Sequence, residues 1–326
     1  MAGRRSQLLT AAIWLAFLLA PLCLNEWRVS QMAQLLTYGL FAMSLALTWG
    51  QAGILCFGQA IFFGVGAYIM ALVTLGRIPA LGDSQATGLA MAMVGSGFVA
   101  LLLGLFMFRG YGLTGAHFAI VTLCASVIAE VGARRWNFIG GFNGLLGVPS
   151  LMSPFPRQDM FLSATEIYFL VLALTFVAYL FLLWLSRTPF GTLMQAIRSN
   201  ENRTRFFGYD VTSLKLFLFI VSTMLAALAG ALFTAQFGFV SPPLVGFALS
   251  TEVLIWVAVG GRDVLLGAVI GAMLVRSVEN TLSDALGEYW LLVTGILFVI
   301  VVVFAPRGLF GDLLRLPRKP GFDRNP

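Results

Sequence analysis

Few side chains in this 326-residue chain could carry out chemistry. It has a single histidine, His117, no H-E-x-x-H zinc pattern and no G-x-x-x-x-G-K-[ST] phosphate-binding loop. Its three cysteines, Cys23, Cys56 and Cys124, are widely separated in apolar sequence, so they predict neither a metal site nor a disulfide framework. We therefore expect no catalytic residue, no metal and no cofactor, and the chain cannot hydrolyse ATP through a P-loop.

Ionisable groups that could relay protons are also scarce. Glu130 and Glu252 lie at or near the ends of apolar segments, and His117 alone is a poor relay, so proton-coupled transport is not favoured. A packing role is the simpler interpretation for His117, whereas a helix-start acid and a pore residue compete for Glu252. Polar side chains within apolar sequence are candidates for lining a path, although each also suits helix packing. They are Gln51, Gln59, Thr114, Thr122, Ser126 and Glu252.

The composition of the chain indicates what kind of structural elements hold these residues in place. The chain is 59% hydrophobic and 10% charged, with a mean hydropathy of +0.92, whereas soluble domains carry about 25% charged residues. Several stretches of about 20 apolar residues can each cross a hydrocarbon core of roughly 30 Å. The sequence predicts an all-α polytopic membrane bundle, one domain over residues 1–326, with about 8–10 membrane segments. They are 8–24 (a retained span, not a cleaved signal peptide), 31–49, 54–76, 86–108, 113–132, 163–186, 213–236, 249–260, 264–281 and 288–305.

Lys and Arg predict the orientation of the chain. With the N-terminus inside, six of the 20 basic residues fall outside and the remaining 14 fall inside, as the positive-inside rule requires. Both termini are therefore expected in the cytoplasm, and the net charge of +6 reflects this asymmetry and not nucleic-acid binding. The residues placed outside are Arg28, Arg77, Arg134, Arg135, Arg157 and Arg276.

Two glycine-rich stretches predict broken or re-entrant helices. Residues 50–68 read GQAGILCFGQAIFFGVGAY, and residues 259–273 read VGGRDVLLGAVIGAM. Non-helical backbone inside a membrane persists only where protein or water satisfies it, and paired interrupted segments point to a transport site. We therefore add Gly58, Gly260 and Gly261 to the candidate path or gate.

Two long loops should carry ordered structure. The outside loop, about residues 133–162, is rich in Gly and Pro, which indicates turns. The inside loop, about residues 187–212, reads RTPFGTLMQAIRSNENRTRFFGYDV over 187–211. Pro189 can start a helix, Leu193, Ala196 and Ile197 share one face, and Gly208 can end it. The inside loop thus predicts a short amphipathic helix lying under the membrane.

The chain resembles the permeases of bacterial ABC importers for branched-chain amino acids and their relatives for urea and short amides. The matching stretches run in order over nearly the whole chain and are specific as a set. They are WGQAGILCFGQAIFFGVGAY (49–68), GGFNGLLGVP (140–149), GTLMQAIRSNENRTRFFGYDV (191–211), LAALAGALF (225–233), IWVAVGGRDVLLGAVIGAMLV (255–275) and FAPRGLFG (304–311). SNENRTRFFGY and IWVAVGGR look nearer the urea branch and GGFNGLLGVP nearer the amino-acid branch, so the substrate stays open between them.

The resemblance implies partners and a coupling role for the inside loop. The partners are a homologous second permease, two ATPase subunits that bind the ATP, and a periplasmic or lipid-anchored solute-binding protein, assembled in a bacterial inner membrane. In such importers a cytoplasmic coupling helix docks into a cleft on the ATPase, whose closure switches the permease between inward- and outward-facing states. Arg side chains can form charge-assisted bonds there, Phe side chains can fill the cleft, and Gly191 permits close approach. The expected coupling residues are Pro189, Phe190, Gly191, Ala196, Ile197, Arg198, Arg203, Arg205, Phe206 and Gly208.

Two other function classes compete with an importer permease. A stand-alone secondary carrier or channel for a small neutral solute such as urea would need no ATPase, and neighbouring genes for two ATPases and a binding protein would argue against it. An integral membrane enzyme acting on lipid would need His, Asp or Ser groups clustered at one interface, and the sequence offers none. Without the resemblance, a solvated basic loop is the simpler interpretation of residues 187–212.

Overall fold

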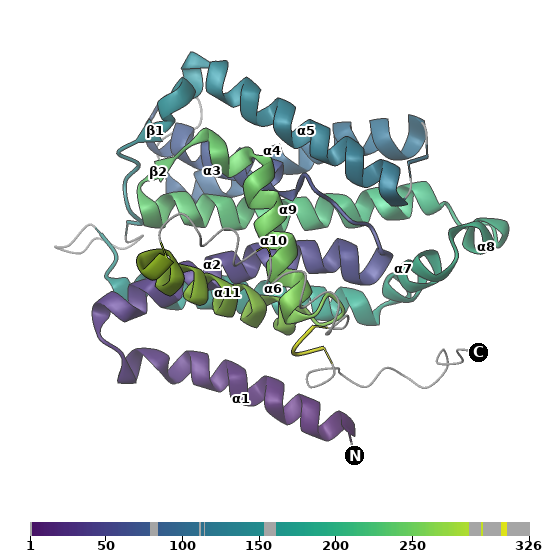
Figure 1. Ribbon diagram of the computed structural model, residues 1–326, viewed down its shortest axis with the longest axis horizontal. Helices are drawn as coiled ribbons and strands as arrows, with labels where there is room; N and C mark the ends of the chain where they lie inside the picture. Colours follow the sequence, from purple (N-terminus) through teal and green to yellow (C-terminus); the bar gives the residue numbers. More distant parts are fainter. Residues whose placement is uncertain are drawn as a thin grey trace.

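The computed structural model describes residues 2–78, 84–110, 112–113, 115–152, 161–286, 295 and 308–311, most of them helical. The central helices run roughly side by side, with α1 and α5 at opposite edges of the bundle and α10 crossing the others (Figure 1). The principal helices are α1 (Ala2–Cys23), α2 (Glu26–Leu47), α3 (Gln59–Thr74), α4 (Gln85–Gly104), α5 (Gly115–Arg135), α6 (Ala164–Arg187), α9 (Val211–Phe237), α10 (Phe247–Gly260) and α11 (Leu265–Leu286). The predicted all-α membrane bundle is confirmed.

Helix length and apolar character identify the membrane spans. Five helical stretches are long and apolar enough to cross a membrane, namely Glu26–Ala52, Gln85–Arg109, Gly115–Arg135, Ala164–Arg187 and Val211–Phe237. The pair α10 and α11 passes the same test jointly but bends by 117° at a short break, as a broken span or re-entrant loop does. Gln7–Cys23 and Gln59–Thr74 are shorter apolar helices. The last expected segment, 288–305, lies outside the described residues apart from residue 295.

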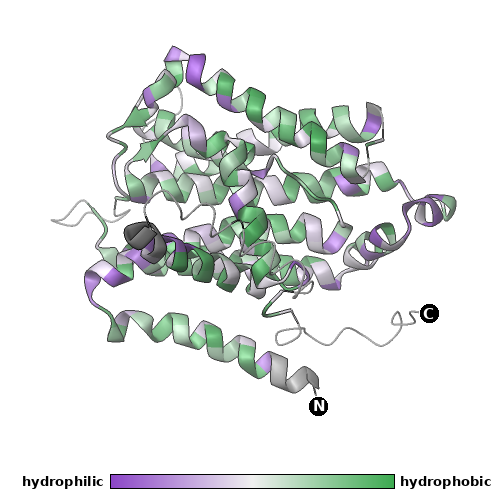
Figure 2. Cartoon of the chain, in the orientation of Figure 1, coloured by the Kyte–Doolittle hydropathy of each residue, from purple (hydrophilic) through white to green (hydrophobic). Residues whose placement is uncertain are grey.

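Packing separates core helices from lipid-facing ones. Phe41, Phe63 and Trp256 are fully buried where α2, α3 and α10 meet, with ring centroids 4.6 Å apart for Phe41 and Phe63. The α4 helix and the π-helical turn η3 (Leu105–Gly110) that continues it instead expose Val94, Phe98, Leu102 and Phe106, which recur every four residues and so form one stripe. Figure 2 shows hydrophobic colour along the long helices, whose outward faces are as apolar as a lipid environment requires.

The two ends of the bundle carry the irregular elements. At one end lie the π-helical extension of α2, η1 (Thr48–Ala52), another π-helical turn, η3 (Leu105–Gly110), and the short helices α7 (Pro189–Ser199) and α8 (Glu201–Phe206). The opposite end holds η4 (Asn137–Ile139), η5 (Gly141–Asn143), η6 (Pro242–Val245) and an antiparallel pair of short strands, β1 (Leu145–Leu146) and β2 (Phe239–Val240). The N-terminal end of α1 lies toward the α7–α8 end (Figure 1).

Candidate functional site

The predicted amphipathic helix of the inside loop is two helices. Pro189 occupies the first turn of α7, where its missing N–H costs nothing. The chain then breaks at Asn200, whose side chain accepts a hydrogen bond of 3.0 Å from the Arg203 amide and so caps α8. The helix ends at Phe206, and Gly208 follows with φ +85°, so the expected stop near Gly208 agrees with the structure.

The α7 helix packs tightly on its own chain. Gly191, Met194 and Ile197 are its buried residues, and Ala196 is half-buried. A Cβ atom on Gly191 would lie 2.3 Å from the carbonyl oxygen of Ser186. The close approach that Gly191 permits is therefore to the end of α6, whereas the sequence had suggested approach to a partner. Phe190 likewise packs edge-on against Phe217 of α9, with ring centroids 5.2 Å apart.

Arg198 joins three segments that are far apart in the sequence. Its guanidinium pairs with the Asp263 carboxylate at 2.5 Å, in the break between α10 and α11. It also donates a hydrogen bond to the carbonyl of Gly50 in η1. Arg198 was expected to bond to a partner subunit; within this chain its guanidinium contacts η1 and the break between α10 and α11.

The two glycine-rich breaks touch each other directly. A Cβ atom on Gly50 would lie 2.1 Å from the carbonyl oxygen of Arg262, so only glycine allows this approach. Gly261 has φ +110°, outside the range that other residues favour, and it ends α10 where the chain reverses. Leu309 donates its amide to the Val259 carbonyl at 2.8 Å, which adds the C-terminal segment to this junction. The two glycine-rich stretches, which the sequence predicts to line a path, are thus in direct contact at Gly50 and Arg262.

The deeper candidate path residues are mostly buried packing groups. Gln59 is fully buried, and its amide donates to the hydroxyls of Ser44 and Ser222, both at 3.0 Å. Thr122 accepts a hydrogen bond of 3.1 Å from the Phe57 amide and lies against Gly58. These polar atoms fasten α3 to its neighbours, and neither side chain lines the cavity beside α7 and α8 described below. Thr114 lies outside the described residues.

Gln51 and Gly260 also lie at helix contacts. The Gln51 side chain is nearly buried and meets Gln195 of α7 at 3.5 Å. A Cβ atom on Gly260 would lie 2.1 Å from the carbonyl oxygen of Gly267, so α10 and α11 cross at this point without side chains between them. Both positions therefore adjoin the junction around Arg198.

Glu252 belongs to a charged cluster that sequence reasoning missed. Arg276 lies 3.6 Å from Glu252 and 3.1 Å from Glu279, and it donates to the Tyr38 hydroxyl at 2.9 Å. Its guanidinium also lies 4.4 Å from the centroid of the Tyr38 ring. Arg276 was expected on the outside; in the structure it lies within α11, as the predicted segment 264–281 implies, and its side chain faces the bundle. Two opposite charges three residues apart in an apolar helix were the available signal.

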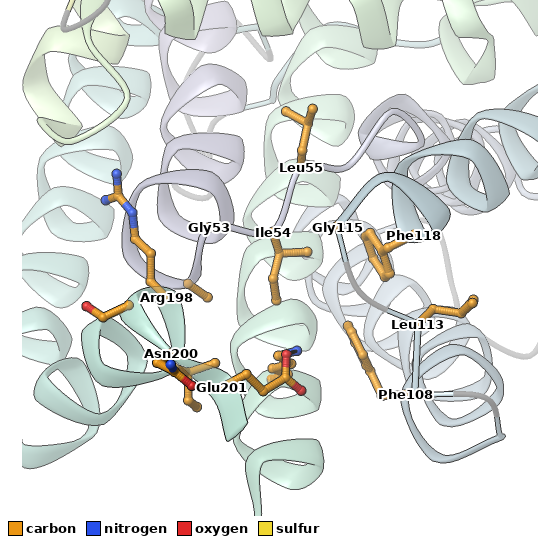
Figure 3. Close-up of a pocket in the computed structure, with 14 residues that line it drawn as sticks. Gly53, Ile54, Leu55, Phe108, Leu113, Gly115, Phe118, Arg198, Asn200 and Glu201 are labelled. Atoms are coloured by element: carbon orange, nitrogen blue, oxygen red, sulfur yellow. Dashed lines mark hydrogen bonds and ion pairs between the residues drawn. The ribbon is translucent and has the colours of Figure 1, made fainter. Parts of the chain in front are cut away.

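A cavity of about 250 Å³ opens beside α7 and α8. One wall is the irregular chain after η1, another is the turn between η3 and α5, and the third is the junction of α7 and α8 (Figure 3). Its apolar lining residues are Ala52, Ile54, Leu55, Phe108, Leu113, Phe118 and Ile197, and its polar ones are Arg198, Ser199, Asn200, Glu201 and Lys215.

Aromatic and basic side chains project from α8 and the turn that follows. Phe206 and Phe207 are 91% and 81% exposed, and Arg203 is exposed beside them. Arg205 is exposed too, although it lies 3.4 Å from Glu201. Figure 2 shows hydrophilic colour along much of α7 and α8, so the two exposed rings lie in polar sequence.

Asp210 caps the helix that follows this turn. Hydrogen bonds from the Ser213 hydroxyl and the Ser213 amide hold the pKa of Asp210 below its ordinary value. The carboxylate therefore stays charged at the positive end of α9 and fixes where the exposed turn joins the bundle.

Comparison with known proteins agrees with this architecture. Residues 28–302 match a family described as branched-chain amino acid transport system / permease component. The high-affinity branched-chain amino acid transport system permease protein LivM of Salmonella typhimurium is 29% identical over 310 residues, covering 89% of this chain and 71% of the relative. The probable branched-chain amino acid transport permease protein LivM of Methanocaldococcus jannaschii is 26% identical over 332 residues, covering 88% and 93%.

More distant similarity extends to other import systems. The ribose import permease protein RbsC of Bacillus subtilis is 32% identical over 149 residues, which covers 42% of this chain and 46% of the relative. No solved structure matches the chain.

Proposed function

The chain belongs to the branched-chain amino acid permease family of ABC importers, and we propose that it moves these amino acids into the cytoplasm by alternating access. It is a membrane permease subunit and not an enzyme. Such a subunit requires an ATPase and a solute-binding protein as partners. We propose two ATPase subunits, a second homologous permease, and a binding protein that delivers the amino acid.

Charge distribution supports a cytoplasmic position for α7 and α8. Described Lys and Arg residues at the α7–α8 end outnumber those at the opposite end, as the positive-inside rule requires of a cytoplasmic face. The first group is Arg109, Arg187, Arg198, Arg203, Arg205, Lys215 and Arg262, and the second is Arg28, Arg77, Arg134 and Arg135. With this orientation both termini are cytoplasmic, and β1 and β2 face the binding protein.

The observation that carries the proposal is the junction at Arg198. An ATPase that grips the α8 tip would move α7, and Arg198 would pull on Gly50 and Asp263 together. Gly50 lies in the last turn of the α2 span and Asp263 in the break between α10 and α11, so small shifts there can open or close a path. A stand-alone carrier has no ATPase to move α7, so there this contact would serve packing alone.

Reconstitution with the cognate ATPases, second permease and binding protein in liposomes tests the function. We expect leucine, isoleucine and valine uptake that requires ATP, binding protein and intact ATPase subunits. Uptake of urea or a short amide in preference to leucine would redirect the substrate assignment. Solute movement through this chain alone, with no nucleotide or companion protein, would show a carrier or channel instead.

A further inference from the structure

The cavity beside α7 has two chemically different sides. One side is an apolar wall. It is formed by aliphatic residues on one part of the lining and mainly aromatic residues on another, namely Ile54, Leu55 and Ile197, and Phe108, Leu113 and Phe118. Figure 3 shows the Phe108 and Phe118 rings on the side opposite the α7–α8 junction. At about 250 Å³ the space is below the roughly 300–1,000 Å³ of sites for drug-sized ligands, so it suits a smaller molecule.

The polar side of the cavity carries both signs of charge. Lys215 is 5% exposed and pairs with Glu201 at 2.5 Å, and both residues line the cavity. Among the described residues Glu201 is the hydrogen-bond partner of the Lys215 ammonium, which has three donors, so donors remain for a further acceptor. The Arg198 guanidinium points away toward Gly50, so only its alkyl stem faces the space (Figure 3).

A helix end adds to this asymmetry. Ala52 and Gly53 line the cavity where α2 and η1 end, which is the carbonyl end of a long helix and favours a positive group. A ligand there would meet the Glu201 carboxylate and the negative end of this helix on one side, the Lys215 ammonium beside them, and an aliphatic and aromatic wall opposite.

We propose that this cavity binds an aliphatic α-amino acid on the cytoplasmic side of the path, with its ammonium at Glu201, its carboxylate at Lys215 and its side chain against Ile54, Phe108 and Phe118. The inference rests on the proposed function and assigns an exit-side site for the same substrate. A ligand held there contacts the α7–α8 junction, so an amino acid that has accumulated in the cytoplasm would resist movement of α7.

Protection of a single cysteine tests the site. Cys23 and Cys124 are exposed and are replaced by Ala, whereas buried Cys56 is kept. Ser199→Cys places a thiol on the cavity rim, and Thr192→Cys places a matched thiol on the exposed face of the same helix. The full complex in nanodiscs, without nucleotide, is labelled with a maleimide in the presence of leucine, leucinol or isocaproate.

We expect leucine, at about twice its dissociation constant, to slow labelling of Ser199→Cys by about threefold and to leave Thr192→Cys unchanged. Leucinol lacks the carboxylate and isocaproate lacks the ammonium, so neither should protect at that concentration. Three results would overturn the proposal: equal labelling with and without leucine, equal slowing at both cysteines, or protection by leucinol and isocaproate as strong as that by leucine.

The same preparation is assayed for uptake driven by ATP and binding protein. Leucine uptake without protection of Ser199→Cys would remove the cavity site and leave the proposed function intact. Uptake of another solute but not leucine would overturn the proposed function, and the assignment of the cavity with it.

Discussion

Arg198 and Asp263 form an ion pair of 2.5 Å between α7 and the break that separates α10 from α11. The same guanidinium donates to the Gly50 carbonyl, so one side chain bridges a surface helix and both interrupted membrane helices. The pair is partly shielded, with about a quarter of each side chain exposed. Hydrogen bonds to charged groups contribute about 1.5–3 kcal/mol, more than a solvated surface pair does.

Charge exchange at this pair should separate coupling from assembly. We expect Arg198→Glu or Asp263→Arg alone to reduce leucine-stimulated ATPase activity of the complex by about tenfold, equivalent to roughly 1.4 kcal/mol. The double variant restores opposite charges and should recover part of that loss. Activity is measured on complexes matched for subunit content. Full coupling in both single variants would show that the junction transmits nothing.

Gly50 should tolerate no side chain. A Cβ atom would lie 2.1 Å from the Arg262 carbonyl oxygen, so Gly50→Ala must push η1 away from the hinge. Overpacking of this kind costs about 1–3 kcal/mol, which we expect as a lower melting temperature in detergent together with lost transport. Gly132→Ala is the matched control, since a Cβ at Gly132 meets no atom within 4 Å. Equal melting temperatures for the two variants would contradict the close contact.

The exposed rings of Phe206 and Phe207 should carry the contact with the ATPase. Buried aromatic anchors dominate protein interfaces, and truncation of one costs about 2 kcal/mol or more. Phe206→Ala with Phe207→Ala should therefore weaken ATPase binding to the permease by more than about tenfold, measured by titration in nanodiscs. Phe106→Ala, which removes a 61% exposed ring from the lipid-facing turn η3, should leave that affinity unchanged. If both variants bind alike, α8 does not dock the ATPase.

Sequence was a strong guide to the elements and a weak guide to their contacts. Apolar length alone located the helices, because a backbone in lipid must satisfy its own hydrogen bonds. Glycine spacing pointed to both irregular regions, because Gly50 permits a close approach to Arg262 and Gly261 tolerates a positive φ. The break at Asn200 was missed because residues 189–208 were interpreted as one helix, although Asn is a favoured residue at a helix N-terminus.

The sequence pattern could not predict which side chains pair with one another. Arg198 and Asp263 are 65 positions apart, and Arg276 and Tyr38 are 238 apart, so no local spacing links them. The basic residues of loop 187–212 could not be told apart in the sequence, yet Arg198 packs against its own chain and Arg203 faces solvent. Gln59 looked like a path residue because glutamine is rare in membrane segments. A glutamine that is fully buried and hydrogen-bonded to Ser44 and Ser222 fits the same observation equally well.

Arg276 should be required for stability because two carboxylates depend on it. Replacing one partner of a buried ion pair costs about 3–5 kcal/mol, so Arg276→Leu should abolish or sharply reduce the folded permease in membranes. Combining it with Glu252→Gln and Glu279→Gln removes the uncompensated charges and should restore much of the folded yield. The readout is monodisperse protein after extraction. Normal yield of Arg276→Leu alone would mean that Glu252 and Glu279 do not need its charge.

The outer loop offers a test that separates folding from docking. A Cβ atom on Gly144 would lie 2.0 Å from the Val240 carbonyl oxygen, and its φ is +70°, so Gly144→Val should disrupt the pairing of β1 with β2 and lower the melting temperature. Asn143 is exposed one residue earlier and faces the side where the binding protein is proposed to dock. Asn143→Trp should leave the melting temperature unchanged and reduce binding-protein-stimulated uptake. Because the two substitutions are adjacent, loss of uptake without loss of stability at Asn143 would locate the docking surface, whereas full uptake would exclude this loop from it.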